Sequence, residues 1–289
     1  MMINFLKTNL RYIGNWASKI AGTILSLLTL LLTFVSWDDL GLASKYDRLL
    51  VLFLIVIVSI IFAFLILFFK QSNVLWEMGI GKIKVIYGDI LKIAFPKKDK
   101  GNKIVVIPVN TCFDTIVGYG LVSEKTIHGK WIVELGTRGV NTAELDKQII
   151  QNIKDQGLRY SELYSESQKP KGKRERFAQG TVLSVEGKFG ITYYLLALSE
   201  FDKNLNAQCS KEEFIACIQS LMAFYDKNGQ GRPIYLPLMG TGLSRVNISP
   251  EESLNILVNI IKLNRDRVHG EVNIVVFSRQ KDTVSIHSV

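Results

Sequence analysis

Residues 103–110 read Lys-Ile-Val-Val-Ile-Pro-Val-Asn, an apolar and mostly β-branched run that ends in a polar amide. A short continuous run of this kind is typical of a strand that is buried on both faces of a sheet. A second such run, Lys82 to Tyr87, ends at Gly88-Asp89. The two runs therefore predict buried strands with a polar residue at each carboxyl end.

Strands and helices are expected to alternate along the rest of this region. Apolar runs predict further strands at 181–185, 191–198, 234–236 and 272–277. Apolar residues at helical spacing, with capping residues before them, predict helices at 141–156, at 211–228 after Ser210, and from Ser249-Pro250 to about Leu263. Such alternation is typical of a three-layer α/β domain, in which helices cover both faces of the sheet.

Two long apolar segments precede this domain. Residues 49–69 contain no charged residue, and as a helix they would span about 30 Å, the thickness of the hydrocarbon core of a bilayer. Residues 17–37 are less apolar, and a cleaved signal peptide is the alternative there. No small-x-small cleavage site precedes Trp37, however, and a second span follows. We therefore expect a transmembrane hairpin within residues 1–80 and a soluble domain at 81–289.

The charges that flank this hairpin predict its orientation. Basic residues precede the first apolar segment and follow the second, at Lys7, Arg11, Lys19, Lys70, Lys82 and Lys84. Lys and Arg are enriched on the cytoplasmic side of membrane proteins, so both termini are expected in the cytoplasm. The lipid bilayer is then one partner of the chain.

The formal net charge of +9 does not indicate nucleic acid as a partner, because no basic stripe interleaved with aromatic residues accompanies it. The basic segment Lys169 to Arg176 is either a solvated loop or a contact for lipid phosphates. The cysteines form no CxxC pair and have no histidine at metal-ligand spacing. We therefore expect neither a metal site nor a disulfide framework at Cys112, Cys209 and Cys217.

Three strand ends carry residues that suit a nucleotide, and ligands of open α/β sheets bind beyond the carboxyl ends of the strands. At Gly88-Asp89-Ile90, a carboxylate can accept a hydrogen bond from the amine of an adenine. Asn110 offers a donor and an acceptor to ribose hydroxyls. The small residues Gly240-Thr241-Gly242 let backbone amides approach phosphate oxygens. Each motif alone also fits an ordinary turn or cap.

Taken in this order, the three motifs resemble the macro domain, an ADP-ribose-binding fold. The resemblance covers roughly residues 82–277 and implies a three-layer α/β domain with a mixed central sheet. It implies that Asp89 and Ile90 meet the adenine and that Asn110, with Thr111, meets the distal ribose. The pyrophosphate loop would then consist of Met239, Gly240, Thr241, Gly242, Leu243, Ser244 and Arg245.

The segment after Asn110 departs from the common macro pattern. Where hydrolytic macro domains carry Asn-Ala-Ala-Asn and a run of glycines, this chain reads Asn-Thr-Cys-Phe-Asp-Thr from residue 110. The difference argues against ADP-ribosyl hydrolysis, and no catalytic residue is predicted. With Thr-Ile-His-Gly at 126–129 and the two upstream apolar helices, the chain resembles the membrane-associated macro effectors of type II Thoeris antiphage systems.

This second resemblance implies a protein of the bacterial inner membrane that responds to a histidine-linked ADP-ribose made by a partner TIR-domain synthase. It implies no cofactor beyond that nucleotide ligand. Asp114, His128 and Gly129 would be additional ligand contacts. From the residues alone, Asp114 equally fits a turn cap, and His128 equally fits a structural hydrogen bond.

The expected function is that of a sensor and effector in antiviral defence, which binds the nucleotide and then disrupts the cell membrane. Two helices per chain cannot enclose a channel, so membrane disruption predicts a homo-oligomer. A membrane-tethered ADP-ribosyl hydrolase and a passive scaffold that reads ADP-ribose are the alternatives.

Overall fold

A computed structural model describes residues 2–98, 101–202, 206–242 and 246–289 of the chain. The chain divides into two compact units, Met1–Asn73 with Arg279–Ser288, and Val74–Ser278 with Val289. The predicted boundary at residue 80 therefore lies seven residues earlier, after Asn73. Residues 279–288, which were expected to belong to the soluble domain, fold with the N-terminal helices.

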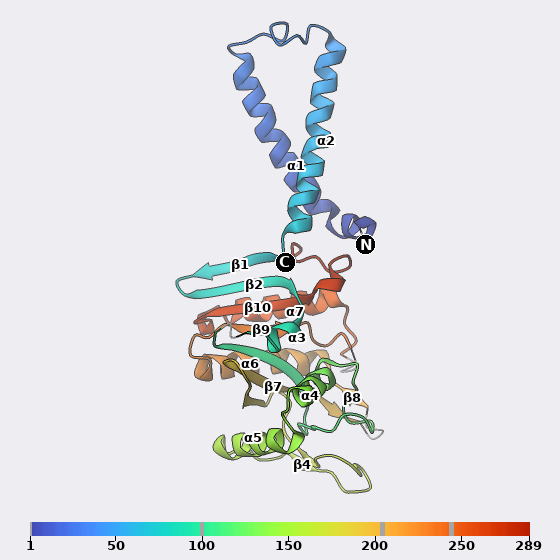
Figure 1. Ribbon diagram of the computed structural model, residues 1–289, viewed down its shortest axis with the longest axis vertical. Coiled ribbons are helices and arrows are strands. Elements are labelled where there is room, and N and C mark those ends of the chain that lie inside the picture. Colours follow the sequence, from blue (N-terminus) through green and yellow to red (C-terminus); the bar gives the residue numbers. More distant parts are fainter. Residues whose placement is uncertain (1, 99–100, 203–205, 243–245) are drawn as a thin grey trace. The chain divides into compact units, whose positions relative to one another are not determined.

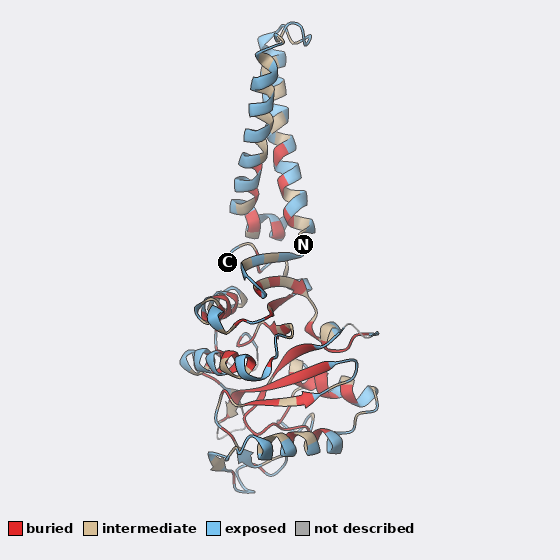
Figure 2. Cartoon of the chain, turned by 90° about the vertical axis from the view of Figure 1, so that its left-hand side faces the viewer, coloured by how far each residue is buried: buried red, intermediate tan, exposed pale blue. Residues whose placement is uncertain are grey.

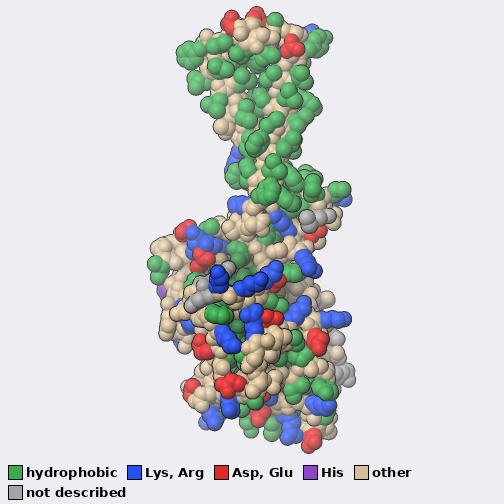
Figure 3. Space-filling view, in the orientation of Figure 1, with side chains coloured by type: hydrophobic (Ala, Val, Ile, Leu, Met, Phe, Trp, Pro, Cys, Tyr) green, Lys and Arg blue, Asp and Glu red, His purple; other side chains and the backbone are tan. Residues whose placement is uncertain are grey.

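The first unit contains two long helices, α1 (Met2–Leu32) and α2 (Lys45–Phe69). Both are long and apolar enough to cross a membrane. Hydrophobic side chains cover them, and acidic side chains gather at the loop that joins them (Figure 3). Helix α1 begins well before the predicted residue 17, because Phe5, Asn9 and Ile13 continue the buried face of Ala17 at a spacing of four residues.

The second unit is built on a mixed sheet. Its strands are β1 (Ser72–Met78), β2 (Gly81–Gly88), β3 (Lys103–Asn110), β6 (Val182–Glu186), β7 (Ile191–Phe201), β8 (Ala207–Gln208), β9 (Ile234–Pro237) and β10 (Glu271–Phe277). Their order is β1-β2-β10-β9-β3-β7-β6, and β8 pairs with β7 (Figure 1). Strands β2, β10, β9, β3 and β7 run parallel, whereas β6 and β8 are antiparallel to β7. Strands β4 (Glu162–Leu163) and β5 (Glu175–Arg176) form a separate pair.

Helices cover both faces of this sheet (Figure 2). Buried side chains of α3 (Ile90–Ala94), α4 (Ile127–Thr137) and α5 (Thr142–Asp155) share one cluster with alternate residues of β3, Val105, Ile107 and Val109. Helices α6 (Lys211–Asn228) and α7 (Pro250–Leu263) pack together on the other face. The short 3-10 helices η1 (Arg265–Arg267) and η2 (Ser278–Gln280) flank β10. The predicted three-layer α/β class with a mixed central sheet is confirmed.

Helix α4 was not predicted from the sequence. Gly129, Gly136 and the β-branched residues between them lower its intrinsic helix propensity. Its stability comes instead from packing, since Trp131, Ile132 and Leu135 are buried at helical spacing. The helix matters for the site described next, because its first turn forms part of a wall.

Candidate functional site

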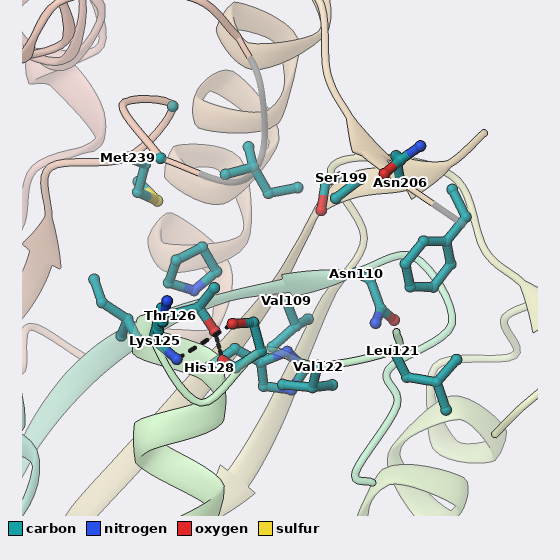
Figure 4. Close-up of a pocket in the computed structure, with 18 of the residues that line it drawn as sticks. Val109, Asn110, Leu121, Val122, Lys125, Thr126, His128, Ser199, Asn206 and Met239 are labelled. Carbon is teal, nitrogen blue, oxygen red and sulfur yellow. Dashed lines mark hydrogen bonds between the residues drawn. The ribbon is translucent and has the colours of Figure 1, made fainter. Parts of the chain in front are cut away.

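A cavity of about 450 Å³ lies at the carboxyl ends of β9, β3 and β7 (Figure 4). Its size falls within the usual range of roughly 300–1,000 Å³ for small-molecule sites. Parallel strands bring their C-terminal loops to one edge of a sheet, so the position follows from the strand order. The described residues that line it are Pro108, Val109, Asn110, Gly120, Leu121, Val122, Ser123, Lys125, Thr126, Ile127, His128, Leu198, Ser199, Phe201, Asn206, Ala207, Leu238, Met239, Gly240, Thr241 and Gly242.

The loop after β9 gives the cavity a wall with few side chains. Gly240 has a φ of +80°, and a Cβ there would come within 3.0 Å of Ile248. The carbonyl of Met239 accepts a hydrogen bond of 2.6 Å from the Ser253 hydroxyl of α7, which fixes the loop to that helix. Thr241 and Gly242 follow and are exposed. Backbone groups of this loop are therefore accessible to a ligand.

The N-terminus of α4 lies on the same cavity. Thr126 caps the helix by accepting a hydrogen bond of 3.0 Å from the amide of Gly129, and its own hydroxyl donates to Ser123 at 2.7 Å (Figure 4). Helix N-termini favour anions, because the free amides and the helix dipole present positive charge. The exposed Lys125 beside it adds a cation. This end of the cavity therefore suits a negatively charged group.

Gly129 has a packing role in this turn rather than a place on the cavity. A Cβ on Gly129 would lie 2.2 Å from the carbonyl oxygen of Ser123. The glycine thus lets α4 approach the loop that carries Lys125.

Gly129→Ala is expected to lower the free energy of unfolding by about 1–3 kcal/mol, the usual effect of an added group in a tightly packed place. Gly136→Ala, in the same helix, is the matched control, because nothing lies within 4 Å of a Cβ there. That change is expected to be neutral or to stabilise by up to about 1 kcal/mol through better helix propensity. Chemical denaturation of both variants measures the difference. Equal effects of the two changes would contradict the assigned packing role.

Asn110 presents its amide group to the cavity at the end of β3. Its Oδ1 accepts hydrogen bonds from the backbone amides of Cys112 at 3.1 Å and Asp114 at 3.2 Å. A shift of the β3–β7 register between Val109 and Asn110 marks the point where the strand leaves the sheet. Because the oxygen is held by the following turn, the side-chain nitrogen is the group that remains to donate to a ligand.

His128 is a buried, neutral group in the cavity wall. The pKa of its imidazole is lowered to about 3, mainly by desolvation and also by the nearby charge of Lys173, while a hydrogen bond with the Asp114 backbone opposes the shift. The ring is 7% exposed. At neutral pH it therefore carries no charge and can hydrogen-bond without attracting an anion.

Asp114 does not line the cavity. Its carboxylate forms an ion pair of 2.6 Å with Lys169, and both side chains are completely buried. It also accepts a hydrogen bond of 2.8 Å from the backbone amide of Lys173. This geometry does not favour the ligand contact that the resemblance implied for Asp114, since the charge of its carboxylate is already compensated by Lys169.

The basic segment 169–176 folds back onto the loop that follows β3. The ammonium of Lys169 donates to Asp114 and to the carbonyl of Lys173 and lies 5.2 Å from the ring centroid of Phe201, a cavity residue. Lys173 in turn donates to the carbonyl of Phe113 at 2.7 Å. The segment is thus neither a wholly solvated loop nor free to place Lys169 on lipid phosphates.

The predicted ligand residues divide into three groups. Those that line the cavity are Asn110, His128, Met239, Gly240, Thr241 and Gly242. Those that lie elsewhere are Asp89, Ile90, Thr111, Asp114 and Gly129. Leu243, Ser244 and Arg245 lie outside the residues that the structure describes.

Asp89 is at the same sheet edge but belongs to a more distant strand. The order β2-β10-β9-β3 separates its strand from β9 by one strand and from β3 by two. At about 4.8 Å between neighbouring strands, this places Asp89 roughly 14 Å from Asn110 across the sheet. One carboxylate oxygen of Asp89 accepts a hydrogen bond of 3.0 Å from Leu91 and caps α3. Ile90 is buried in the core cluster.

Sequence reasoning missed the wall formed by residues 120–127 and by the end of β7. Ser199 and Phe201 end a long apolar strand in the same manner as Asn110, so the rule applied to β3 could have found them. Asn206 and Ala207 line the cavity from the next segment and had no comparable signal. Within the described ranges there is no cluster of three His, Cys, Asp or Glu residues that could hold a metal ion.

The fold, with a cavity at the ends of its parallel strands, defines a macro-type α/β domain. Two helices of membrane-spanning length and composition precede this domain in the sequence. Residues 83–277 match the family description "Thoeris protein ThsA, Macro domain", and the chain belongs to this family. This membership confirms the resemblance seen in the sequence.

The chain is also similar to a named relative and to solved macrodomain structures. The chain is 27% identical over 247 residues to Thoeris protein ThsA of Bacillus amyloliquefaciens strain Y2, which covers 85% of this chain and 76% of that protein. A mutant macrodomain from Oceanobacillus iheyensis, solved with ADPR, has a TM-score of 0.47 and 14% identity, covering 75% of this chain and 95% of its own. The macrodomain of the same organism with ADP has a TM-score of 0.45 and 15% identity, with the same coverage of both chains.

Proposed function

We propose that the macro domain binds an ADP-ribose-type nucleotide and that this binding controls the two membrane-type helices in antiphage defence. The observation that carries the proposal is the convergence of three kinds of group on one cavity. A side-chain-poor loop at Gly240–Gly242, the N-terminus of α4 with Lys125, and the amide of Asn110 all line it. Membership of the ThsA macro family supports the same nucleotide class.

Each part of such a ligand has a suitable counterpart. A diphosphate would lie between the loop at Gly240–Gly242 and the first turn of α4, where backbone amides and the charge of Lys125 compensate its oxygens. The donor group of Asn110 would meet ribose hydroxyls. The adenine would extend toward β2, where Asp89 keeps one carboxylate oxygen outside the cap of α3. The ligand would thus run along the edge of the sheet.

A binding role is favoured over hydrolysis by the groups that line the cavity. Of its described lining residues none is Asp or Glu, and the only ionisable ones are Lys125 and His128. Hydrolysis of an ADP-ribosyl bond needs a general base near the attacking water. The sequence offers Asp114 and Glu124 as candidates. Asp114 is held in its ion pair with Lys169, and Glu124 is not among the residues that line the cavity. We therefore assign a ligand-binding effector and not an enzyme.

The signal itself, the partner and the membrane action belong to the same proposal. By analogy with the family, the ligand is a histidine-linked ADP-ribose supplied by a TIR-domain synthase. Helices α1 and α2 would cross the bacterial inner membrane with both chain termini in the cytoplasm. Copies of the chain would associate, because two helices per chain cannot enclose a conducting path.

Titration calorimetry with ADP-ribose and its histidine conjugate, on the full-length protein in detergent, tests the binding step. Asn110→Ala is expected to weaken binding at least tenfold, since it removes the donor to the ribose at the cost of about 1.4 kcal/mol or more. The exposed Asn228→Ala on α6 is the matched control and should bind as the wild type does. A folded wild-type protein that binds neither compound would remove the proposal.

Lys125→Ala isolates the contribution of charge. The change is expected to weaken the binding of ADP and of ADP-ribose alike by roughly 3- to 10-fold, or about 1 kcal/mol, because solvent screens the charge of the exposed ammonium. Adenosine, which lacks phosphate, should be unaffected. Lys130→Ala is the control, because Lys130 is exposed on α4 nearby but does not line the cavity. Equal losses for adenosine and ADP would show that Lys125 does not meet the phosphates.

A further inference from the structure

The C-terminal segment 279–288 is part of the unit formed by the N-terminal helices. Val284 and Ile286 are fully buried there, and Ser285 is 2% exposed. A terminal segment with this degree of burial is held by specific packing, whereas chain ends are usually loosely ordered. We call residues 279–288 the clasp.

The clasp is bonded to α1 at two successive residues. The hydroxyl of Thr8 donates to the carbonyl of Asp282 at 2.8 Å. The hydroxyl of Ser285 donates to Oδ1 of Asn9 at 2.6 Å, and the side chain of Asn9 is fully buried. Leaving a buried amide without its hydrogen-bond partner costs free energy, so this contact favours the state in which the clasp is bound to α1.

The clasp also holds the end of α2. The ammonium of Lys281 donates to the carbonyl of Phe68 and lies 4.7 Å from the ring centroid of Phe68 and 5.6 Å from that of Phe5. One cation therefore contacts both helices. Burial lowers the pKa of Lys281, in accord with its enclosed position. Beyond the end of α2, the side chain of Asn73 donates to the carbonyl of Ile286 at 2.9 Å.

The clasp is located where the two helices pack against each other. Their shared buried cluster comprises Phe5, Ile13, Ala17, Ala63 and Leu67. These residues belong to the first half of α1 and the last part of α2, and so lie at the end that the clasp contacts. The contacts of the clasp with both helices therefore stabilise the packing of these two helix ends against each other.

The chain also connects the clasp to the nucleotide cavity. Strand β10 is followed directly by η2 and the clasp. Its neighbour in the sheet is β9, with Val275 opposite Pro237. The pairing continues one residue further, where the amide of Leu238 donates to the carbonyl of Val275 at 3.3 Å. Leu238 and Met239 line the cavity, and the strand that leads into the clasp pairs with the strand that ends at this wall.

We propose that the clasp transmits nucleotide binding to the membrane helices. It holds the Phe5 end of α1 against the Phe68 end of α2, and nucleotide in the cavity favours a state in which the clasp is released and these ends separate. The ligand can shift this equilibrium only by binding the released state more tightly. The link to the nucleotide rests on the proposed function, whereas the hold on the helices does not.

A distance measurement tests the hold without any ligand. Spin labels at Leu10→Cys and Phe69→Cys, both at exposed positions, report the separation of the helix ends in the full-length protein in liposomes. The native cysteines are buried and escape labelling. The double change Lys281→Ala and Ser285→Ala is expected to shift the distance distribution to larger values, whereas Lys7→Ala, at an exposed position of α1 outside the clasp, is expected to have no effect. Unchanged distances in the double variant would overturn the proposal.

A cross-link tests the transmission. In the variant Thr8→Cys with Asp282→Cys, both at partly exposed neighbouring positions, a short cleavable thiol-reactive bridge should lock the clasp onto α1 and leave the Ser285–Asn9 bond intact. The bridged protein is expected to bind histidine-linked ADP-ribose with wild-type affinity but to lose nucleotide-induced dye release from liposomes, and cleavage of the bridge should restore release. Release from the bridged protein would overturn the proposal. If the reduced protein binds no nucleotide, the proposed function fails instead, and the distance measurement still decides whether the clasp holds the helices.

Discussion

Lys169→Met is expected to lower the free energy of unfolding of the macro domain by about 3–5 kcal/mol, the usual effect of leaving one member of a buried ion pair without its partner. The side chains of Asp114 and Lys169 are both completely buried, with 2.6 Å between their charged atoms. Without Lys169, the carboxylate would retain the backbone amide of Lys173 as its donor. A single neutral donor does not replace the solvation that a buried carboxylate has lost.

The double variant Asp114→Asn with Lys169→Met removes both charges but keeps most of the buried volume of the pair. Asparagine keeps an oxygen that can accept from the amide of Lys173, and methionine keeps most of the buried volume of lysine. Replacing both members of a buried pair is often close to neutral. The double variant is therefore expected to recover at least about 2 kcal/mol relative to Lys169→Met, which a double-mutant cycle measures as a coupling energy.

An exposed ion pair provides the control for this cycle. Arg174 and Glu166 are 3.9 Å apart, and their side chains are 47% and 85% exposed. Arg174→Met is expected to change stability by less than about 0.5 kcal/mol, since solvent screens such a pair. Chemical denaturation is measured for the wild type, Asp114→Asn, Lys169→Met, the double variant and Arg174→Met. If Lys169→Met is as mild as Arg174→Met, the buried pair does not fix this part of the fold.

The same pair shows where sequence reasoning reached its limit. The sequence left Asp114 open as a turn cap or a ligand contact, and the segment around Lys169 as a solvated or lipid-facing loop. These residues are 55 positions apart, and no periodicity or motif links them. Their pairing depends on Gly172, where a Cβ would come within 2.3 Å of the Asp114 carboxylate. A contact of this kind is decided by tertiary packing, which a single sequence does not reveal.

The ends of the strands could be predicted because the residues that specify a buried strand are adjacent in the sequence. The runs at 82–87 and 103–109 contain enough β-branched apolar residues to specify buried strands, and the structure confirms them as β2 and β3. Parallel pairing then brings Asn110 and Gly240 to one edge of the sheet without further information. The macro class could therefore be predicted, and the family match confirms it.

The parts that escaped prediction depend on distant partners. Helix α4 has weak local propensity and exists because Trp131 is fully buried against the sheet. The clasp residues were assigned to the soluble domain because they follow its last strand. They fold with the helices through side chains such as Asn9, which no local pattern connects to Ser285.

Acidification is expected to destabilise the macro domain through His128. In the folded protein desolvation lowers the pKa of this imidazole to about 3, whereas an unfolded chain has the ordinary value of 6.5. Between these two values the unfolded chain binds a proton that the folded chain does not. The contribution of His128 to stability is therefore fully present above pH 6.5 and is lost progressively as the pH falls below it.

At pH 4.5 this loss is expected to be on the order of 2–3 kcal/mol, since each pH unit within the window corresponds to about 1.4 kcal/mol. Denaturation of the full-length protein at pH 7 and pH 4.5, compared between wild type and His128→Gln, isolates the effect. The variant should lose less stability between the two pH values. His269→Gln, which replaces an exposed histidine, should follow the wild type. If His128→Gln is as acid-sensitive as His269→Gln, then the imidazole of His128 accepts a proton in the folded domain, and its place in the cavity wall is open to water.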